Sequence, residues 1–235
     1  PDQVLRVNIL STLNLLEWAK DKPGVKILYS SSSEVYAGAL NLGIGIIPTG
    51  ENVPLCIDDI SNVRWSYGAS KLLAENAFFS YAKVYPIHFC IVRYHNIYGA
   101  RMGFEHVIPQ FYERIYNGEV PLKVYGGHQT RAFCYVSDAV KATQFVMESK
   151  STRNSIIHIG NNQEEININD LAKIMLEITG NPQDVIQEDP PEGSVNRRCP
   201  DISFLRSLGF VPEVSLKEGL KETMRYYETI FNVLG

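Results

Sequence analysis

Tyr67 and Lys71 have the residue types and the spacing of a proton-transfer pair. They are four residues apart at the start of a predicted helix, so their side chains lie one turn apart on the same face. A phenol has a pKa of about 10, and a neighbouring cation stabilises the phenolate and lowers that pKa. The spacing therefore predicts a general base built from two residues. Because this spacing is also common on exposed helices, a solvated surface pair is the alternative.

A hydroxyl and a carboxylate follow the preceding predicted strand. Ser32 and Glu34 are two residues apart, which in extended backbone directs both side chains to the same side. Ligands of a doubly wound sheet bind at the carboxyl ends of its strands, so we expect both groups to face a ligand crevice. The alternative is that the serines only cap the strand and Glu34 is solvated. For Ser30 and Ser31, the residues themselves favour capping.

The elements that must position these side chains alternate along the chain. Apolar residues at helical spacing predict helices over 8–20 and 67–85, and short apolar runs predict buried strands over 25–29 and 88–92. Beyond residue 100 we expect helices over 107–117, 137–147, 169–179 and 216–231, and strands over 122–125 and 156–159. This alternation predicts an α/β fold with a doubly wound, mostly parallel sheet.

Two segments between these elements are candidate binding loops. Residues 37–64 are rich in Gly, Pro, Asn and Asp, which predicts a long surface loop, and loops of this length are often functional. The Pro- and Glu-containing stretch 188–195 is the second candidate.

Composition and charge exclude several classes of protein. The 235 residues carry 22 basic and 26 acidic side chains, a formal net charge of −4, and 45% are hydrophobic, as in an ordinary globular domain. Without a block of Lys or Arg, neither nucleic acid nor an anionic membrane is the expected main partner. The apolar runs fall far short of the roughly 20 residues that span a bilayer, and the first residues carry no secretory signal, so we expect a cytoplasmic protein. The four cysteines and five histidines lack metal-ligand spacing, so no metal site is expected.

A series of short motifs runs along the chain. In order, they are Asn8 with Asn14-Leu15-Leu16-Glu17, Ser30-Ser31-Ser32-Ser33-Glu34-Val35-Tyr36, Tyr67 with Lys71, Arg93-Tyr94-His95-Asn96-Ile97-Tyr98-Gly99, Val124-Tyr125-Gly126, Arg131-Ala132-Phe133-Cys134-Tyr135-Val136-Ser137-Asp138 and Ile159-Gly160-Asn161. Together they resemble the extended short-chain dehydrogenase/reductase family of NAD-dependent nucleotide-sugar epimerases, dehydratases and decarboxylases. The resemblance covers nearly the whole chain.

The resemblance implies a reaction and a role for each matched residue. In that family a bound nicotinamide takes a hydride from the sugar, usually at C4, and a transient keto-sugar forms. Tyr67 would remove the hydroxyl proton, Lys71 would hold the nicotinamide ribose and keep the pKa of Tyr67 low, and Ser32 would hydrogen-bond the reacting hydroxyl. Further implied cofactor contacts are Asn8, Ser30 and Tyr94, and implied nucleotide-sugar contacts are Asn96, His106, Val107, Tyr125 and Arg131. Arginine suits a diphosphate because its donors match phosphate oxygens.

Glu34 is the residue that distinguishes between the reactions of the family that the chain resembles. Simple 4-epimerases need no carboxylate there, whereas sugar dehydratases and UDP-glucuronate decarboxylases have one, which can act as an acid or base beyond C4. Dehydratases specific for dTDP-glucose carry Asp where this chain has Ser33, so the sequence disfavours a dTDP-glucose dehydratase. Residues 62–67 and 126–131 resemble the decarboxylase half of the bifunctional polymyxin-resistance enzyme. We therefore expect a UDP-glucuronate decarboxylase-like enzyme or a dehydratase, with a 4-epimerase as the alternative.

The chain departs from the family pattern in two places. The loop Pro191-Glu192-Gly193-Ser194 stands where the family often has Arg/Glu-Gly-Asp, so Arg197 or Arg198 is expected to supply a phosphate contact instead. The family's glycine-rich turn is also not found, because the only lookalike, 43–48, has Pro48 in place of the third glycine and sits in a predicted loop. One interpretation is that the chain is the C-terminal portion of an NAD-dependent enzyme, with NADP as the alternative cofactor. The other is a non-catalytic nucleotide-sugar binding protein, which the Ser32, Glu34, Tyr67 and Lys71 set disfavours.

The resemblance also implies a division of the chain and an assembly. Residues 1–100 and 132–160 would form the remainder of a Rossmann-like cofactor domain, and residues 101–131 and 161–235 a smaller α/β domain for a nucleotide-diphosphate sugar, with a UDP-sugar favoured. The apolar faces of helices 8–20 and 67–85 match those that pair as a four-helix bundle in family homodimers. Alternatively, both helices simply cover their own sheet.

Overall fold

The computed structural model describes residues 2–191 and 194–234, and this part of the chain divides into two compact units. The first unit comprises residues 1–95, 140–159 and 200–211, and the second comprises residues 96–139, 160–199 and 212–235. The expected division at 100, 132 and 160 assigned residues 200–211 to the other domain; in the structure they pack with the first unit, where α7 (Ser203–Ser207) contacts the last strand of the sheet.

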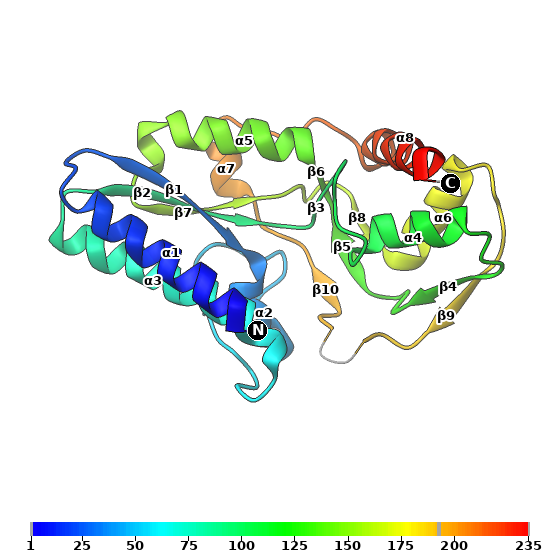
Figure 1. The fold of residues 1–235 in the computed structure, drawn as a ribbon, viewed down its shortest axis with the longest axis horizontal. Helices are drawn as coiled ribbons and strands as arrows, with labels where there is room; N and C mark the ends of the chain where they lie inside the picture. The colour runs from blue at the N-terminus through cyan, green and yellow to red at the C-terminus, as the bar shows by residue number, and fades with distance from the viewer. Residues whose placement is uncertain (1, 192–193, 235) are drawn as a thin grey trace. The chain divides into compact units, whose positions relative to one another are not determined.

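A three-stranded parallel sheet forms the centre of the first unit. Its order is β1 (Lys26–Ser32), β2 (His88–Tyr94), β7 (Ser155–Ile159). In Figure 1, α1 (Asp2–Ala19) and α3 (Ser66–Val84) lie on one side of this sheet and α5 (Val136–Glu148) lies on the other. Apolar residues of the two helices and of β1 and β2 build the core between them, including Leu16, Phe78, Phe89 and Ile91. This is the parallel, two-sided arrangement that the alternating elements predict.

Local chemistry explains how the first unit's elements begin and end. Gly24 has a φ of +80°, a conformation that glycine adopts without strain, and its N–H donates to the carbonyl of Pro86 at 3.0 Å. The turn before β1 is thereby tied to the turn before β2. The predicted strand 25–29 is longer than expected, since β1 runs through Ser32, and α1 begins at Asp2 rather than at residue 8.

The segment 37–64 is only partly the surface loop that its composition predicts. It begins with a short helix, α2 (Ala37–Asn41), whose first residues are buried. A Cβ on Gly38 would lie 2.4 Å from the carbonyl oxygen of Cys56, so only glycine allows this close approach of the two backbones. The expectation of an exposed loop was therefore wrong for residues 37–39. The 43–48 lookalike follows α2 instead of opening a helix, which agrees with its rejection as a cofactor motif.

Among its described residues, the second unit holds three small sheets and three helices around one core. The sheets are β10 (Arg197–Arg198), β5 (Thr130–Ala132) and β8 (Glu165–Asn167); β3 (Ile97–Tyr98) with β6 (Cys134–Tyr135); and β4 (Leu122–Tyr125) with β9 (Val185–Glu188). The helices are α4 (Val107–Tyr116), α6 (Ile168–Ile178) and α8 (Leu216–Leu234). Their apolar faces meet in a cluster that includes Phe111, Leu171, Met175 and Leu220. Asn167 caps α6 by accepting a hydrogen bond from the Asp170 N–H at 2.8 Å.

Within the described residues, no helix is both long and apolar enough to cross a membrane. The predicted helices and strands are present with shifted ends, and the second predicted binding loop, 188–195, begins at the end of β9 and includes residues 192–193, which lie outside the described part of the chain.

Candidate active site

The first turn of α3 brings Tyr67 against the end of β1. The Asn62 side chain accepts a hydrogen bond from the Arg64 N–H at 3.1 Å and so caps the short 3₁₀ helix that leads into α3. Gly68 follows Tyr67, and a Cβ at that position would lie 3.1 Å from the Glu34 carbonyl oxygen. The absence of a side chain at Gly68 therefore lets the helix approach the residues that follow β1.

Lys71 connects the same helix to β1. Its Nζ donates a hydrogen bond to the Ser30 carbonyl oxygen at 2.9 Å. The ammonium also lies 4.9 Å from the ring centroid of Tyr29 and 5.7 Å from that of Tyr67, positions in which a cation is attracted to the aromatic face. The predicted pair is thus held together, with the cation over the rings.

Ser32 and Glu34 reach Tyr67 by a different geometry from the one predicted. Ser32 is the last residue of β1 and caps the 3₁₀ helix Ser33–Tyr36, its Oγ accepting from the Glu34 N–H at 3.3 Å. Glu34 lies inside that helix, so the extended-backbone argument for a shared direction was wrong. The 3₁₀ turn still brings the Glu34 carboxylate close enough to act on the pKa of Tyr67.

Three influences act on the pKa of Tyr67. Burial raises it, a hydrogen bond with Ser32 lowers it, and the negative charge of Glu34 raises it, with a net rise above the ordinary value. Burial likewise lowers the pKa of Lys71. The causes of the shift in the pKa of Tyr67 do not include Lys71, so the expected lowering by this cation is not found; the lowering influence comes from Ser32.

Arg64 adds a cation beside Glu34. Its Nη2 lies 3.8 Å from the Glu34 Oε2, and its guanidinium carbon lies 4.9 Å from the Trp65 ring centroid. Both charged side chains are partly buried: 31% of the Arg64 side chain and 26% of the Glu34 side chain are exposed to solvent. The site thus contains a carboxylate and a partly accessible guanidinium next to the tyrosine.

The remaining predicted cofactor contacts also lie in the first unit. Asn8, on α1, donates to the Ser70 Oγ at 2.9 Å, and Ser70 in turn donates to the Tyr67 carbonyl oxygen at 2.7 Å. Ser30 offers its carbonyl to Lys71, and Tyr94, at the end of β2, shares a 2.8 Å hydrogen bond with Thr143 of α5. Asn8 is thereby linked to the backbone of Tyr67, while the roles of these residues toward a cofactor stay predictions.

The predicted diphosphate contacts lie in the second unit. Asn96 has a φ of +43°, and its side-chain amide donates to the Ala132 carbonyl at 3.0 Å. Arg131 on β5 pairs in register with Arg198 on β10, so two guanidinium-bearing residues stand on adjacent strands. Arg131 donates to the Thr130 carbonyl and to the Gln129 side chain at 2.8 and 3.1 Å. Arg197 forms a bidentate pair with Glu165 at 2.8 and 2.9 Å.

A groove of about 860 Å³ opens beside Tyr125 in the same unit. Tyr125 is the one predicted nucleotide contact among its described lining residues, which also include Gln110, Arg114, Lys123, Ile186 and Pro191. His106 stands at the N-cap position of α4 without a capping hydrogen bond from its side chain, and Val107 is the first residue of the helix, one turn before Gln110. The ring of Tyr125 is half exposed and lies 5.9 Å from the Arg114 guanidinium carbon.

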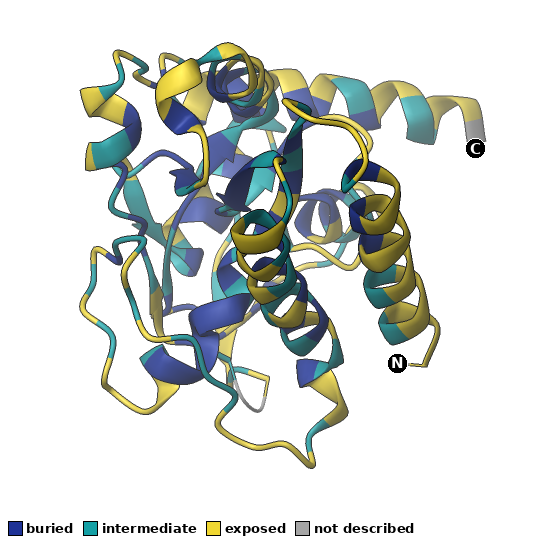
Figure 2. Ribbon diagram, turned by 90° about the vertical axis from the view of Figure 1, so that its left-hand side faces the viewer, coloured by how far each residue is buried: buried dark blue, intermediate teal, exposed yellow. Residues whose placement is uncertain are grey.

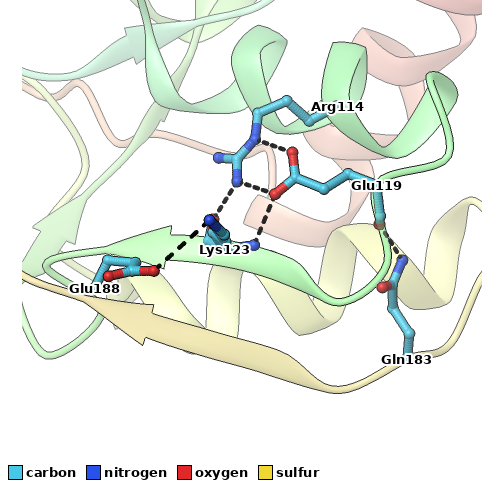
Figure 3. Close-up of polar contacts among 5 residues, drawn as sticks. All are labelled: Arg114, Glu119, Lys123, Gln183 and Glu188. Atoms are coloured by element: carbon cyan, nitrogen blue, oxygen red, sulfur yellow. Dashed lines mark hydrogen bonds and ion pairs between the residues drawn. The ribbon is translucent and has the colours of Figure 1, made fainter.

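The wall of this groove is an ionic network that sequence reasoning missed (Figure 3). Arg114 forms a bidentate pair with Glu119 at 2.7 and 2.5 Å and donates to the Lys123 carbonyl at 2.6 Å. Glu119 also accepts the Lys123 N–H at 3.0 Å. These bonds hold the pKa of Glu119 down, at about 2, chiefly through Arg114. Because the two residues are five apart across a helix end, no helical spacing signals the pair.

Comparisons with known proteins place the chain in a family. The model of the NAD dependent epimerase/dehydratase family matches residues 1–160. The chain belongs to this family. A UDP-N-acetyl-alpha-D-glucosaminuronate decarboxylase of Bacillus cytotoxicus is 35% identical over 98% of this chain and 72% of its own length. UDP-glucuronic acid decarboxylase 3 of Arabidopsis thaliana is 36% identical over 94% of this chain and 62% of its own length.

Solved structures agree with this epimerase/dehydratase membership. A Thermotoga maritima UDP-glucose 4-epimerase with UDP-glucose superimposes with a TM-score of 0.84 at 29% identity, covering 97% of this chain and 71% of that chain. The predicted family, α/β fold class and class of chemistry, nucleotide-sugar epimerase or decarboxylase, are confirmed. This chain spans between 62% and 72% of the length of the three proteins compared.

Proposed function

We propose that this chain serves an NAD-dependent enzyme that decarboxylates a UDP-linked uronic acid. The observation that carries the proposal is Glu34 beside Tyr67 with the Arg64 guanidinium 3.8 Å from its carboxylate. A guanidinium offers planar, bidentate recognition of a substrate carboxylate, and Glu34 supplies a second acid–base group next to the tyrosine. The similarity to two nucleotide-uronate decarboxylases supports the same reaction.

Oxidation at C4 makes carboxyl loss from a uronate easy. The ketone at C4 is beta to the carboxylate, so breaking the C5–C6 bond releases carbon dioxide and leaves an enolate, which takes a proton at C5. In this scheme the Tyr67 phenolate accepts the proton of the C4 hydroxyl, and Ser32 hydrogen-bonds the same oxygen. Glu34 holds or delivers a proton near C5, and Arg64 orients the carboxylate before it leaves.

The residues present fit the nicotinamide end of NAD, the proposed cofactor, which when bound accepts the hydride from C4 and returns it. An ammonium has three donors, and Lys71 directs one to the Ser30 carbonyl, which leaves donors for ribose hydroxyls. Lys71 is also held close to the ring of Tyr67. Lys71 would therefore hold the ribose beside the proton-accepting oxygen.

The second unit supplies groups for the nucleotide. The half-exposed ring of Tyr125 offers a stacking surface for uracil, and the Gln110 amide in the same groove has donors and an acceptor for the base edge. Arg131 and Arg198, paired in register on β5 and β10, would meet the diphosphate together with Asn96. A protein with a net charge of −4 thus binds its anion through a few placed groups.

A 4-epimerase is the second candidate, favoured by the similarity to the Thermotoga enzyme. Both reactions share the oxidation at C4. They differ afterwards, because an epimerase returns the hydride to the opposite face of an otherwise unchanged sugar and needs neither Glu34 nor Arg64.

A substrate panel separates the two reactions. The protein is incubated with NAD and UDP-glucuronate, with UDP-glucose in a parallel sample, and carbon dioxide and the product's mass are measured. We expect carbon dioxide from the uronate alone, and at least a hundredfold less of it with Glu34→Gln. Glu148→Gln, an exposed carboxylate on α5, is the matched control and should retain full activity. Inversion at C4 without carbon dioxide would establish the epimerase instead.

We further propose a homodimer formed through α1 and α3. Leu16 and Phe78 are buried in the first unit's core, whereas Leu10, Trp18 and Leu73 remain 49%, 54% and 49% exposed. These exposed apolar side chains support pairing with a second copy. Figure 2 shows exposed residues along much of the helix that begins at the N-terminus. Sedimentation should give twice the monomer mass, and Leu10→Lys should shift it toward the monomer. Ile60→Lys, at a 93% exposed position outside both helices, should not.

A further inference from the structure

The carboxylate of Glu75 is buried where α3 meets β1 and β2. It accepts a hydrogen bond from the Ser31 hydroxyl at 2.5 Å and two from the Arg93 guanidinium, at 2.9 and 2.7 Å. The three residues are only 2%, 3% and 1% exposed. A carboxylate with three short, charge-assisted or hydroxyl bonds is fixed in position as well as neutralised.

This carboxylate lies in line with the proposed catalytic side chains. Glu75 follows Lys71 by four residues and Tyr67 by eight, so the three share one face of α3. Along that face, Tyr67 bonds Ser32, Lys71 bonds the Ser30 carbonyl, and Glu75 bonds Ser31. One face of the helix is therefore bonded to three consecutive residues of β1.

The sheet fixes the other side of this arrangement. Ser31 and Arg93 are direct register partners in the parallel β1–β2 ladder, so both reach the same carboxylate from adjacent strands. The Arg93 Nη1 also donates to the Glu51 carbonyl at 2.9 Å, which holds the guanidinium in its plane. Glu75 thus fixes the position of α3 relative to two strands whose register is already set by the sheet.

Stability alone does not account for such a group. Moving a pair of ions into the interior carries a large desolvation penalty for each ion, and apolar residues of similar volume often stabilise a fold as well or better. An apolar contact tolerates sliding of the helix along the strand, whereas hydrogen bonds of fixed direction do not. Displacement of a catalytic group by about 1 Å can cost about a hundredfold in rate.

We propose that Glu75, held by Ser31 and Arg93, is a positioning residue that sets the register of α3 on β1 and thereby the placement of Tyr67 against Ser32. The consequence for turnover rests on the proposed function, because both candidate reactions use Tyr67 at C4. The placement itself does not depend on which nucleotide sugar is the substrate.

Four variants test this role. The double variant Glu75→Leu/Arg93→Met replaces the ion pair by apolar groups of similar size, and Ser31→Ala removes one bond while keeping the pair. Ser31→Thr restores a hydroxyl on a strand that tolerates β-branching. Thr152→Val removes a buried hydroxyl that bonds the Val146 carbonyl, and controls for that loss elsewhere in the first unit.

Two readouts are compared, with thermal unfolding to show that each variant is folded. The first is titration of Tyr67 by NMR of tyrosine labelled at Cζ, assigned with Tyr67→Phe; the second is the kcat and KM for the nucleotide sugar that the parent turns over. We expect Ser31→Ala and the double variant to raise the titration midpoint of Tyr67 and to lower kcat at least tenfold with KM within twofold. Ser31→Thr and Thr152→Val should match the parent.

The outcomes separate this proposal from the proposed function. If the Tyr67 midpoint shifts but the parent decarboxylates no nucleotide uronate, the positioning role stands and the proposed reaction fails. If the folded double variant keeps the parent's midpoint and kcat, the ion pair is only structural and the inference is overturned. Should the double variant fail to fold, equal midpoints and kcat values for Ser31→Ala and Ser31→Thr overturn it instead.

Discussion

The Glu34 carbonyl oxygen lies 3.1 Å from where a Cβ would stand at Gly68. A side chain at this glycine would push the first turn of α3 away from the end of β1 by a few tenths of an ångström. The proposed site depends on the close approach of α3 to the end of β1, and this approach requires glycine at position 68.

Gly68→Ala should separate stability from activity. Alanine favours the helix over glycine by about 1 kcal/mol, and this gain opposes the cost of the close contact with the Glu34 carbonyl oxygen, so thermal stability should change little. Because the helix must shift, we expect kcat to fall about tenfold. Gly50→Ala is the control, since a Cβ there meets nothing within 4 Å and both quantities should stay unchanged. Parental kcat in Gly68→Ala would show that the shift is absorbed elsewhere.

Tyr67→Phe should abolish most of the reaction without affecting the fold. Removal of a positioned acid–base group costs about a hundredfold to ten-thousandfold in rate. The matched control is Tyr85→Phe, which removes a phenol at the other end of α3 and should leave kcat unchanged. Activity of Tyr67→Phe within tenfold of the parent would remove the tyrosine from the proposed chemistry.

The pH dependence should move in opposite directions in two variants. The pKa of Tyr67 is raised by burial and by the charge of Glu34, and lowered by the bond with Ser32. If the phenolate is the active form, kcat/KM rises with pH through this pKa. Ser32→Ala should move the rise to higher pH, and Glu34→Gln should move it to lower pH. Shifts in the same direction would contradict these assignments.

The wall of the groove around Tyr125 should lose stability in acid, because its hydrogen bonds depend on the charge of Glu119. Its pKa in the folded chain is about 2, below the value of about 4.3 of an unfolded glutamate. The stabilisation it provides is therefore fully present above about pH 4.3 and is lost as the pH falls toward 2. Hydrogen exchange of the Lys123 amide, which donates to Glu119, is the local measurement.

Glu119→Gln should reduce the protection of that amide at neutral pH, and the difference from the parent should vanish near pH 2. Protection is corrected for the intrinsic pH dependence of exchange. Glu148→Gln should show the parent's protection throughout. A difference between Glu119→Gln and the parent that persists unchanged down to pH 2 would mean that the carboxylate charge is not what stabilises this wall.

Glu75 shows that the sequence can indicate a buried carboxylate without identifying the residues that bind it. It stands on α3 between Ala74 and Phe78, which are buried, and a carboxylate on a buried helix face requires a buried partner. The partner, Arg93, is on a strand 18 residues away, and only the register of β1 on β2 brings Ser31 to the same carboxylate. Such long-range pairing leaves no periodic trace in the chain.

The sequence by itself determined the α/β alternation, the family and the pairing of Tyr67 with Lys71, because these depend on local periodicity and on spacing within one helix. The tertiary structure decided how Ser32 and Glu34 reach the tyrosine, since a 3₁₀ turn rather than a continued strand follows β1. It also decided that the pKa of Tyr67 is raised, because burial and the charge of Glu34 outweigh the hydrogen bond with Ser32. Burial and strand register are sums over residues far apart in the chain, so they emerge only when the chain is folded.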